Sequence, residues 1–180
     1  LEVRGLTKTF PGVTALDAVS FDLAAGEVHA LCGENGAGKS TLIKVLSGIH
    51  PHGSYEGEIL ADGRPAAFAS IADAENAGIA VIYQELALIG GMTVAENVFL
   101  GVEPRRGALI DWHKMYADTR RLLDEYDLAL DPTARVADLG IGQQQLVEIV
   151  KALAKDSTIL LLDEPTAALT EAEVERLLGI

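Results

Sequence analysis

The fold is decided by the stretch Gly33-Glu34-Asn35-Gly36-Ala37-Gly38-Lys39-Ser40-Thr41. It matches G-x-x-x-x-G-K-[ST] at every fixed position; an apolar run at residues 28–32 precedes it and a helical pattern follows it. Glycines allow successive backbone N–H groups to converge on one anion, and the positive end of the following helix faces the same place. We interpret the stretch as a phosphate-binding loop between a strand and a helix.

Two side chains of the loop have distinct expected roles. Lys39 would reach the β and γ phosphates of a nucleotide as a point charge, and Ser40 would place its hydroxyl on Mg²⁺. The alternative is a glycine-rich strand-to-helix turn that matches the pattern by chance.

Composition limits the possible partners. The 180 residues suit one domain with a sizeable core. The net charge of −13 repels nucleic acid phosphate and an anionic membrane surface, so we expect no nucleic acid partner unless another chain supplies a basic surface. The longest strongly apolar run, residues 159–162, is far too short to cross a bilayer.

The single cysteine, Cys32, excludes an internal disulfide framework and suits a reducing compartment. Its place at the end of an apolar run predicts a small buried side chain. The chain starts without methionine and stops within a helical pattern. We expect it to be a piece of a longer protein.

Periodicity in the first half predicts short elements. They are strands at 1–4, 19–23 and 27–32, a helix around 42–49, a strand pair near 58–61, a helix at 71–76 and a buried parallel strand at 79–83. Phe10 lies in an expected turn at 8–13, and Asp62-Gly63 is typical of a hairpin turn. No further ligand with suitable spacing supports a metal site at His50 and His52.

The second half is mainly helical by pattern. We expect helices over 94–100, around 115–126 and over 143–154, and then a buried strand at 158–162. Trp112 is expected in the core, and Arg120 and Arg121 on a solvated face. The alternation of strand, helix and strand predicts an α/β fold with a parallel sheet and a helical insertion.

Two carboxylates follow the last strand. Asp163 and Glu164 stand at its carboxyl end, the edge where α/β sheets bind ligands. Asp163 would hold Mg²⁺ and complete the metal site begun by Ser40, while Glu164 would polarise an attacking water. An acidic strand end alone is weak evidence, but it is strong after a phosphate loop.

The motifs together resemble an ATP-binding-cassette nucleotide-binding domain over essentially the whole chain. They are the phosphate loop, Gln84, Leu139-Gly140-Ile141-Gly142-Gln143, Asp163-Glu164-Pro165 and residues 167–170. The resemblance implies a P-loop NTPase fold with a RecA-like parallel core, an antiparallel β part and a helical subdomain. The core would comprise residues 1–84 and 155–180, and the helical subdomain would comprise 85–154.

The resemblance also implies roles for particular residues. Phe10 would stack on the adenine of ATP, and Gln84 would contact Mg²⁺ or water and sense a membrane subunit. Together with Lys39, the catalytic residues would be Gln84 and Glu164. Residues 139–143 would complete the ATP site of a partner domain, and residues 167–170 would lie at the same interface.

Finer motifs look like those of sugar-importer ATPases that fuse two such domains, xylose importers in particular. The similar stretches are residues 10–13, 32–36, 51–59, 142–149 and 165–170. The implied partners are a second ATPase domain, fused or as a homodimer, a membrane permease and, indirectly, a periplasmic or extracellular sugar-binding protein. The implied location is the cytoplasmic face of the plasma membrane, as a peripheral subunit that hydrolyses ATP to import a monosaccharide.

Two departures from the family pattern leave alternatives open. Gly140 stands where the signature usually has serine, so a hydroxyl donor to the partner's γ-phosphate is missing. The switch histidine of the family would lie beyond residue 180. A fragment that binds nucleotide without turnover is therefore one alternative, and a non-transport cassette ATPase of DNA repair or translation is another.

Overall fold

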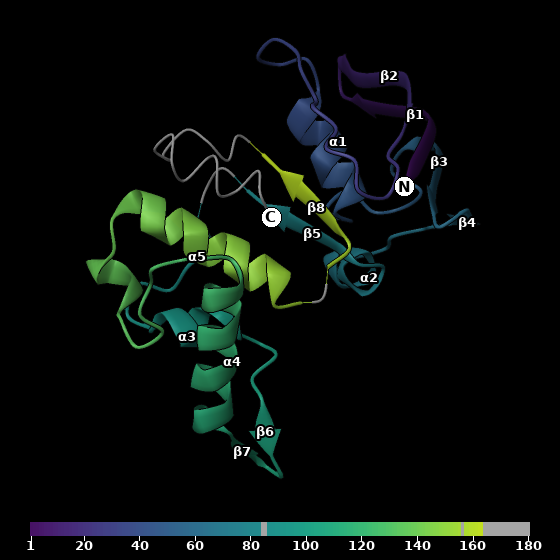
Figure 1. Ribbon diagram of the computed structural model, residues 1–180. Helices are drawn as coiled ribbons and strands as arrows, with labels where there is room; N and C mark the ends of the chain where they lie inside the picture. The colour runs from purple at the N-terminus through teal and green to yellow at the C-terminus, as the bar shows by residue number, and fades with distance from the viewer. Residues whose placement is uncertain (84–85, 156, 164–180) are drawn as a thin grey trace. The chain divides into compact units, whose positions relative to one another are not determined.

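The computed structural model describes residues 1–83, 86–155 and 157–163 (Figure 1). The chain forms two compact units, Leu1–Ala80 and Val81–Ile180. No helix in the described ranges is both long and apolar enough to span a membrane.

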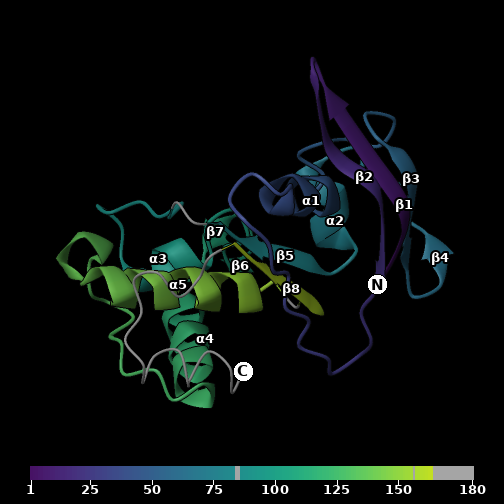
Figure 2. The same ribbon diagram turned by 90° about the horizontal axis from the view of Figure 1, so that it is seen from above.

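An antiparallel sheet in the order β2-β1-β3-β4 builds the first unit. Its strands are β1 (Glu2–Phe10), β2 (Val13–Asp22), β3 (Glu56–Ala61) and β4 (Arg64–Pro65). Figures 1 and 2 show β1 and β2 as a long hairpin with β3 on the other side of β1. The prediction that the turn begins at residue 8 was wrong: β1 continues to Phe10, which pairs with Val13. Backbone pairing extends the strand because it does not depend on apolar side chains.

The second hairpin of this sheet confirms the predicted turn. Asp62 and Gly63 connect β3 to β4 with positive φ angles of 50° and 72°. Two consecutive positive φ angles are typical of the tight turns that join antiparallel strands. The dipeptide therefore sets this connection locally.

Two helices complete the described structure of the first unit. They are α1 (Lys39–Leu46) and α2 (Ile71–Asn76), which has the predicted bounds. α1 buries Leu42, Ile43, Val45 and Leu46. Gly48, just after α1, has a φ of 75°, and a Cβ there would lie 2.3 Å from the carbonyl oxygen of Ser70, the residue that caps α2. The end of α1 and the start of α2 are thus in close contact.

The predicted strand at 27–32 is absent from the structure. This segment has no strand assignment, Val28 is 83% exposed and Cys32 is exposed rather than buried. None of the sheets in the described ranges includes it. An apolar run forms a strand only when another strand pairs with it. The sequence pattern shows the apolar run but not the missing partner, so it predicted a strand that does not form.

A two-stranded sheet consists of β5 (Ile79–Ile82) and β8 (Ile159–Leu162), whose arrows point the same way in Figure 1. Ile79, Ala80 and Ile82 are buried, as predicted for β5. The residues of β8 are only partly buried, in contrast to the prediction. A short strand with a single described neighbour leaves part of its surface uncovered.

The second unit contains the other helices and a small hairpin. They are α3 (Val94–Val98), α4 (Trp112–Glu125), the 3₁₀ helix η1 (Val136–Asp138), α5 (Ile141–Leu153) and strands β6 (Arg105–Arg106) and β7 (Leu109–Ile110). The three α-helices confirm the predicted ones. The hairpin was not predicted, because two-residue strands carry no measurable alternation. The subdivision into a core and a helical subdomain at 85–154 stays a prediction.

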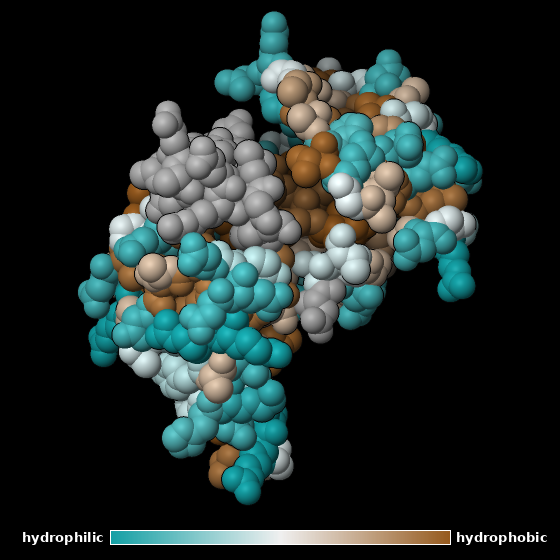
Figure 3. Space-filling view, viewed as in Figure 1, coloured by the Kyte–Doolittle hydropathy of each residue, from teal (hydrophilic) through white to brown (hydrophobic). Residues whose placement is uncertain are grey.

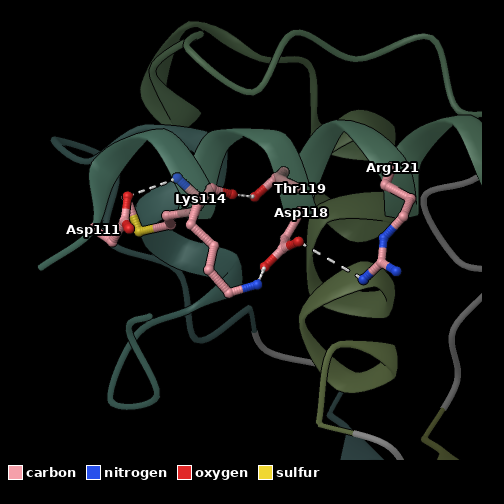
Figure 4. A network of polar contacts seen from close by, with 6 residues as sticks. Asp111, Lys114, Asp118, Thr119 and Arg121 are labelled. Carbon is pink, nitrogen blue, oxygen red and sulfur yellow. Dashed lines mark hydrogen bonds and ion pairs between the residues drawn. The ribbon is translucent and has the colours of Figure 1, made fainter. Parts of the chain in front are cut away.

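Helix α4 is fixed at its start and solvated on one side (Figure 4). The Asp111 side chain accepts a hydrogen bond from the backbone N–H of Lys114, and Asp118 forms ion pairs with Lys114 at 2.7 Å and Arg121 at 3.8 Å. The surface over α4 is mostly hydrophilic (Figure 3). Trp112 is 47% exposed, which contradicts its predicted core position. As the first residue of the helix, it precedes the buried stripe that begins at Met115.

Buried Asn97 connects α3 to the loop before it. Its amide nitrogen donates to the carbonyl oxygens of Ile89 and Thr93, at 3.1 and 3.0 Å, and its amide oxygen accepts from the Ile89 N–H at 2.7 Å. A side chain that satisfies three backbone groups replaces the ladder hydrogen bonds that a loop lacks.

We expect Asn97→Leu to lower the free energy of unfolding by about 1–3 kcal/mol, because it leaves the Ile89 N–H and C=O without these partners. Chemical denaturation of the intact protein measures the change. Leu109→Ser, at a site that is exposed, is the control and should change stability by less than about 0.5 kcal/mol. Equal effects of the two substitutions would contradict this role of Asn97.

Candidate phosphate-binding site

The loop before α1 depends on glycine at two positions. Gly36 and Gly38 have φ angles of 85° and 94°, values that side chains disfavour. A Cβ on Gly38 would lie 2.3 Å from the carbonyl oxygen of Ala15 in β2. The backbone of the loop thus approaches β2 more closely than any residue with a side chain would allow.

Lys39 folds back onto the loop. Its ammonium donates to the carbonyl oxygens of Gly33 at 2.8 Å and Glu34 at 3.0 Å. These neutral oxygens are weaker partners for a cation than a phosphate oxygen is. The side chain therefore already lies over the loop, where it can exchange carbonyl partners for an anion.

The start of α1 suits an anion. Within the described residues, no side chain caps this helix end, and its first turn has no acidic residue. The first N–H groups of a helix lack intrahelical acceptors, and the helix dipole gives this end a partial positive charge. Ser40 is exposed in this turn. Helix start, glycine loop and Lys39 together fit a polyphosphate, and the Ser40 hydroxyl is an oxygen ligand of the type that Mg²⁺ prefers.

An aromatic platform stands at the tip of the β1–β2 hairpin. Phe10 is 37% exposed and pairs across the hairpin with exposed Val13. The ammonium of Lys8 lies 5.1 Å from the centroid of the Phe10 ring, and the His50 ring meets it at 5.5 Å and 63°. The Phe10 ring therefore has both Lys8 and His50 as partners, while part of the residue remains open to solvent.

Charge and burial set the state of His50. Desolvation, with the nearby cations of Lys8 and Lys44, holds the pKa of His50 below its ordinary value of 6.5. The imidazole is therefore neutral at pH 7, so it meets Phe10 as an aromatic ring rather than as a cation. Lys8 is buried and donates to the carbonyl oxygen of Ser54, which fixes the ammonium beside the ring.

Strand β2 connects the platform to the phosphate loop. Ala15 lies against the loop at Gly38. Val13, two residues before Ala15 in β2, pairs with Phe10. Two residues of a strand span roughly 7 Å. An aromatic surface and an anion site thus lie along one strand, in an order that suits a molecule with a flat ring and a phosphate chain.

Sequence reasoning missed Lys8, Val13 and His50 as neighbours of Phe10. Alternation along β1 could have placed Lys8 and Phe10 on one face, and the Pro11-Gly12 turn could have paired Phe10 with Val13. Nothing local in the sequence places His50, forty residues away, against Phe10.

The remaining predicted residues belong to the second unit or lie outside the described residues. Asp163 follows β8, and its backbone N–H donates to the carbonyl oxygen of Ile82 at 2.9 Å. Gln84, Glu164 and residues 165–170 are not among those described. A metal site shared by Ser40, Asp163 and Gln84 stays a prediction. Within the described ranges, no three His, Cys, Asp or Glu side chains gather as a metal-binding group.

The predicted signature at 139–143 forms the start of α5. Gly140 is the N-cap residue, and its N–H donates to the side chain of Gln143 at 3.2 Å. Gln144 donates to the carbonyl oxygens of Val136 and Leu139, at 3.2 and 2.9 Å. Gly140 itself brings no hydroxyl or carboxylate to the helix start. The backbone N–H groups of Ile141 and Gly142 belong to this first turn, which suits an external anion.

Comparisons with known proteins agree with this geometry. The family model described as ABC transporter matches residues 16–167. The xylose import ATP-binding protein of Moorella thermoacetica is 62% identical over all of this chain and 36% of its own length, and that of Thermoanaerobacter pseudethanolicus is 58% identical over the same shares. The L-arabinose transport ATP-binding protein of Geobacillus stearothermophilus is 55% identical, and 35% of it is covered. The chain spans about a third of the length of these curated relatives.

Solved structures show the same fold. A nucleotide-free ATP-binding cassette from an ABC transporter gives a TM-score of 0.84 at 26% identity, over 99% of this chain and 74% of that one. A dimeric cassette in a post-hydrolysis state, bound to ADP and Pi, gives 0.80 at 25% identity, over 99% and 79%. The predicted α/β fold of the P-loop NTPase class is confirmed.

We expect Gly38→Ala to weaken binding of inorganic tripolyphosphate at least tenfold, because the loop must move away from Ala15 to admit a methyl group. Calorimetry on the intact protein measures this affinity. Gly53→Ala is the matched control: Gly53 has a φ of 89° but open space around it. It should cost about 1–2 kcal/mol of stability and leave the affinity unchanged. Unchanged binding in Gly38→Ala would contradict the proposed fit.

Proposed function

Because this chain belongs to the ABC transporter family, we propose that it binds and hydrolyses ATP to drive import of a monosaccharide, with xylose as the sugar. The observation that carries the proposal is the pre-formed anion site of Lys39, the glycine loop and the start of α1. The names of the relatives at 62% and 58% identity support the choice of xylose.

We assign different residues of the chain to phosphate binding, adenine binding, metal binding and proton transfer. The loop amides and Lys39 hold the phosphates, and Lys39 gives up its bonds to Gly33 and Glu34 as it does so. Phe10 offers the exposed part of its ring to adenine. Ser40, Asp163 and Gln84 would hold Mg²⁺, and Glu164 would accept a proton from the attacking water. Bound Mg²⁺ would neutralise charge that develops on the phosphate oxygens.

Transport requires partners. The start of α5, residues 139–143, would complete the ATP site of a second ATPase domain, which is fused or a second copy. The helical segment at 85–154 would dock on a membrane permease at the cytoplasmic face of the plasma membrane. A sugar-binding protein outside the membrane would select the sugar. When the two ATPase domains close on ATP, the helical segment would transmit this rigid-body motion to the permease.

Arabinose is the second candidate sugar, because the arabinose transport ATP-binding protein of Geobacillus stearothermophilus is 55% identical to this chain. This identity is close to the 62% identity of the xylose import ATP-binding protein of Moorella thermoacetica. Residues that contact ATP do not distinguish sugars, so uptake itself must decide between them.

We expect both Lys39→Ala and Glu164→Gln to abolish uptake of labelled xylose by cells that depend on the intact protein. Lys39→Ala should also lose ATP binding, because the phosphates lose their cation. Glu164→Gln should retain ATP binding while turnover falls roughly 10²- to 10⁴-fold, the usual contribution of a general base. Uptake assays and calorimetry measure these effects.

The same assay with labelled arabinose separates the two sugars. If Lys39→Ala abolishes arabinose uptake and leaves xylose uptake normal, arabinose replaces xylose as the proposed sugar. Normal uptake of both sugars in Lys39→Ala would overturn the transport function.

We expect Gly140→Ser to raise ATP-dependent association with the second ATPase domain a few-fold, because it adds a hydroxyl donor for the partner's γ-phosphate. Gly140 has a φ of −64°, and among the described residues a Cβ there would meet only the side-chain oxygen of Gln143, at 3.9 Å. The serine should therefore fold normally. Gly91→Ser, in open space, is the control, and analytical ultracentrifugation with ATP is the measurement. Weaker association in Gly140→Ser would contradict this role.

A further inference from the structure

We infer that His50 is a positioning residue for the nucleobase: its ring holds Phe10 in the orientation that presents one face to adenine. The inference rests on the proposed function, since it assumes that Phe10 receives the base. It assigns a role to a side chain outside the phosphate loop, the carboxylates and the signature.

Two side chains contact the Phe10 ring. Lys8 and Phe10 lie two residues apart in β1 and therefore on the same face of the strand. The Lys8 ammonium lies 5.1 Å from the centroid of the Phe10 ring. The His50 ring meets Phe10 in an edge arrangement, with centroids 5.5 Å apart and planes at 63°. Offset and edge arrangements of this kind are favourable for aromatic pairs. The two contacts restrict rotation of a side chain at an otherwise exposed hairpin tip.

His50 is itself held in place by the backbone. Its backbone N–H donates to the carbonyl oxygen of Lys44 at 2.9 Å, which ties it to the end of α1. Gly48, two residues before His50, packs directly against the backbone of Ser70, where a Cβ on residue 48 would not fit. Helix α1 also starts at the phosphate loop, so the helix that begins at the anion site ends shortly before His50, whose N–H is bound to its residue Lys44.

A restricted Phe10 ring favours binding of a nucleobase. A free phenylalanine at a strand end would lose rotamer freedom when a base stacks on it, and this loss weakens binding. Contacts that restrict the ring beforehand remove part of that loss. The expected gain in affinity for ATP is roughly 2- to 10-fold. It applies only to ligands that carry a base.

The test compares ATP with inorganic tripolyphosphate, which has the phosphates but no base, on the intact protein by calorimetry. His50→Ala should weaken ATP binding roughly 2- to 10-fold and leave tripolyphosphate binding unchanged. His50→Phe, which keeps an aromatic edge, should restore ATP affinity. His52→Ala is the matched control: His52 lies in the same loop but contacts Tyr55 at 5.9 Å, and it should change neither affinity.

A second variant separates positioning from a general structural effect. In a Phe10→Ala background, His50→Ala should have no further effect on ATP binding, because the ring that it positions is gone. An additional loss there, or an equal loss for tripolyphosphate, would overturn the inference. So would an unchanged ATP affinity in His50→Ala while Phe10→Ala weakens ATP binding. If Phe10→Ala leaves the ratio of the two affinities unchanged, the proposed role of Phe10 in the function fails instead.

Discussion

The close approach of the phosphate loop to β2 is the constraint on which the first unit depends. Gly38 has a φ of 94° and lies where any Cβ would meet the Ala15 carbonyl. This approach fixes where α1 begins, and therefore where its uncapped end points. It also places the aromatic tip of the β1–β2 hairpin along the same strand as the anion site. This backbone contact thus places the phosphate loop two residues along β2 from the partner of Phe10.

Two lysine side chains add positive charge to the phosphate loop and to the Phe10 ring. Lys39 lies over the loop on two carbonyl oxygens, and Lys8 lies against Phe10. The chain as a whole carries a net charge of −13, so these two cations act at short range within a repelling field. Desolvation, with the nearby cations of Lys8 and Lys44, lowers the pKa of His50, which disfavours a third positive charge beside Phe10. The site therefore attracts phosphate at one end and an uncharged ring at the other.

Patterns that depend on neighbouring residues were predicted well. The bounds of α2, the hairpin turn at Asp62-Gly63 and the three helices of the second unit agree with the sequence periodicity. Patterns that depend on a distant partner were not. Residues 27–32 read as a strand but have none beside them in the described structure, and Trp112 read as core but begins a helix before its buried stripe.

The sequence by itself determined the phosphate loop, its lysine and the order of motifs that defines the family. Glycine conformations and helix starts are set within a few residues, so a linear pattern is enough to find them. Only the tertiary structure decided the surroundings of Phe10. The contact between Phe10 and His50 joins residues forty positions apart, and it exists because sheet register and the end of α1 bring them together. No local preference encodes that distance.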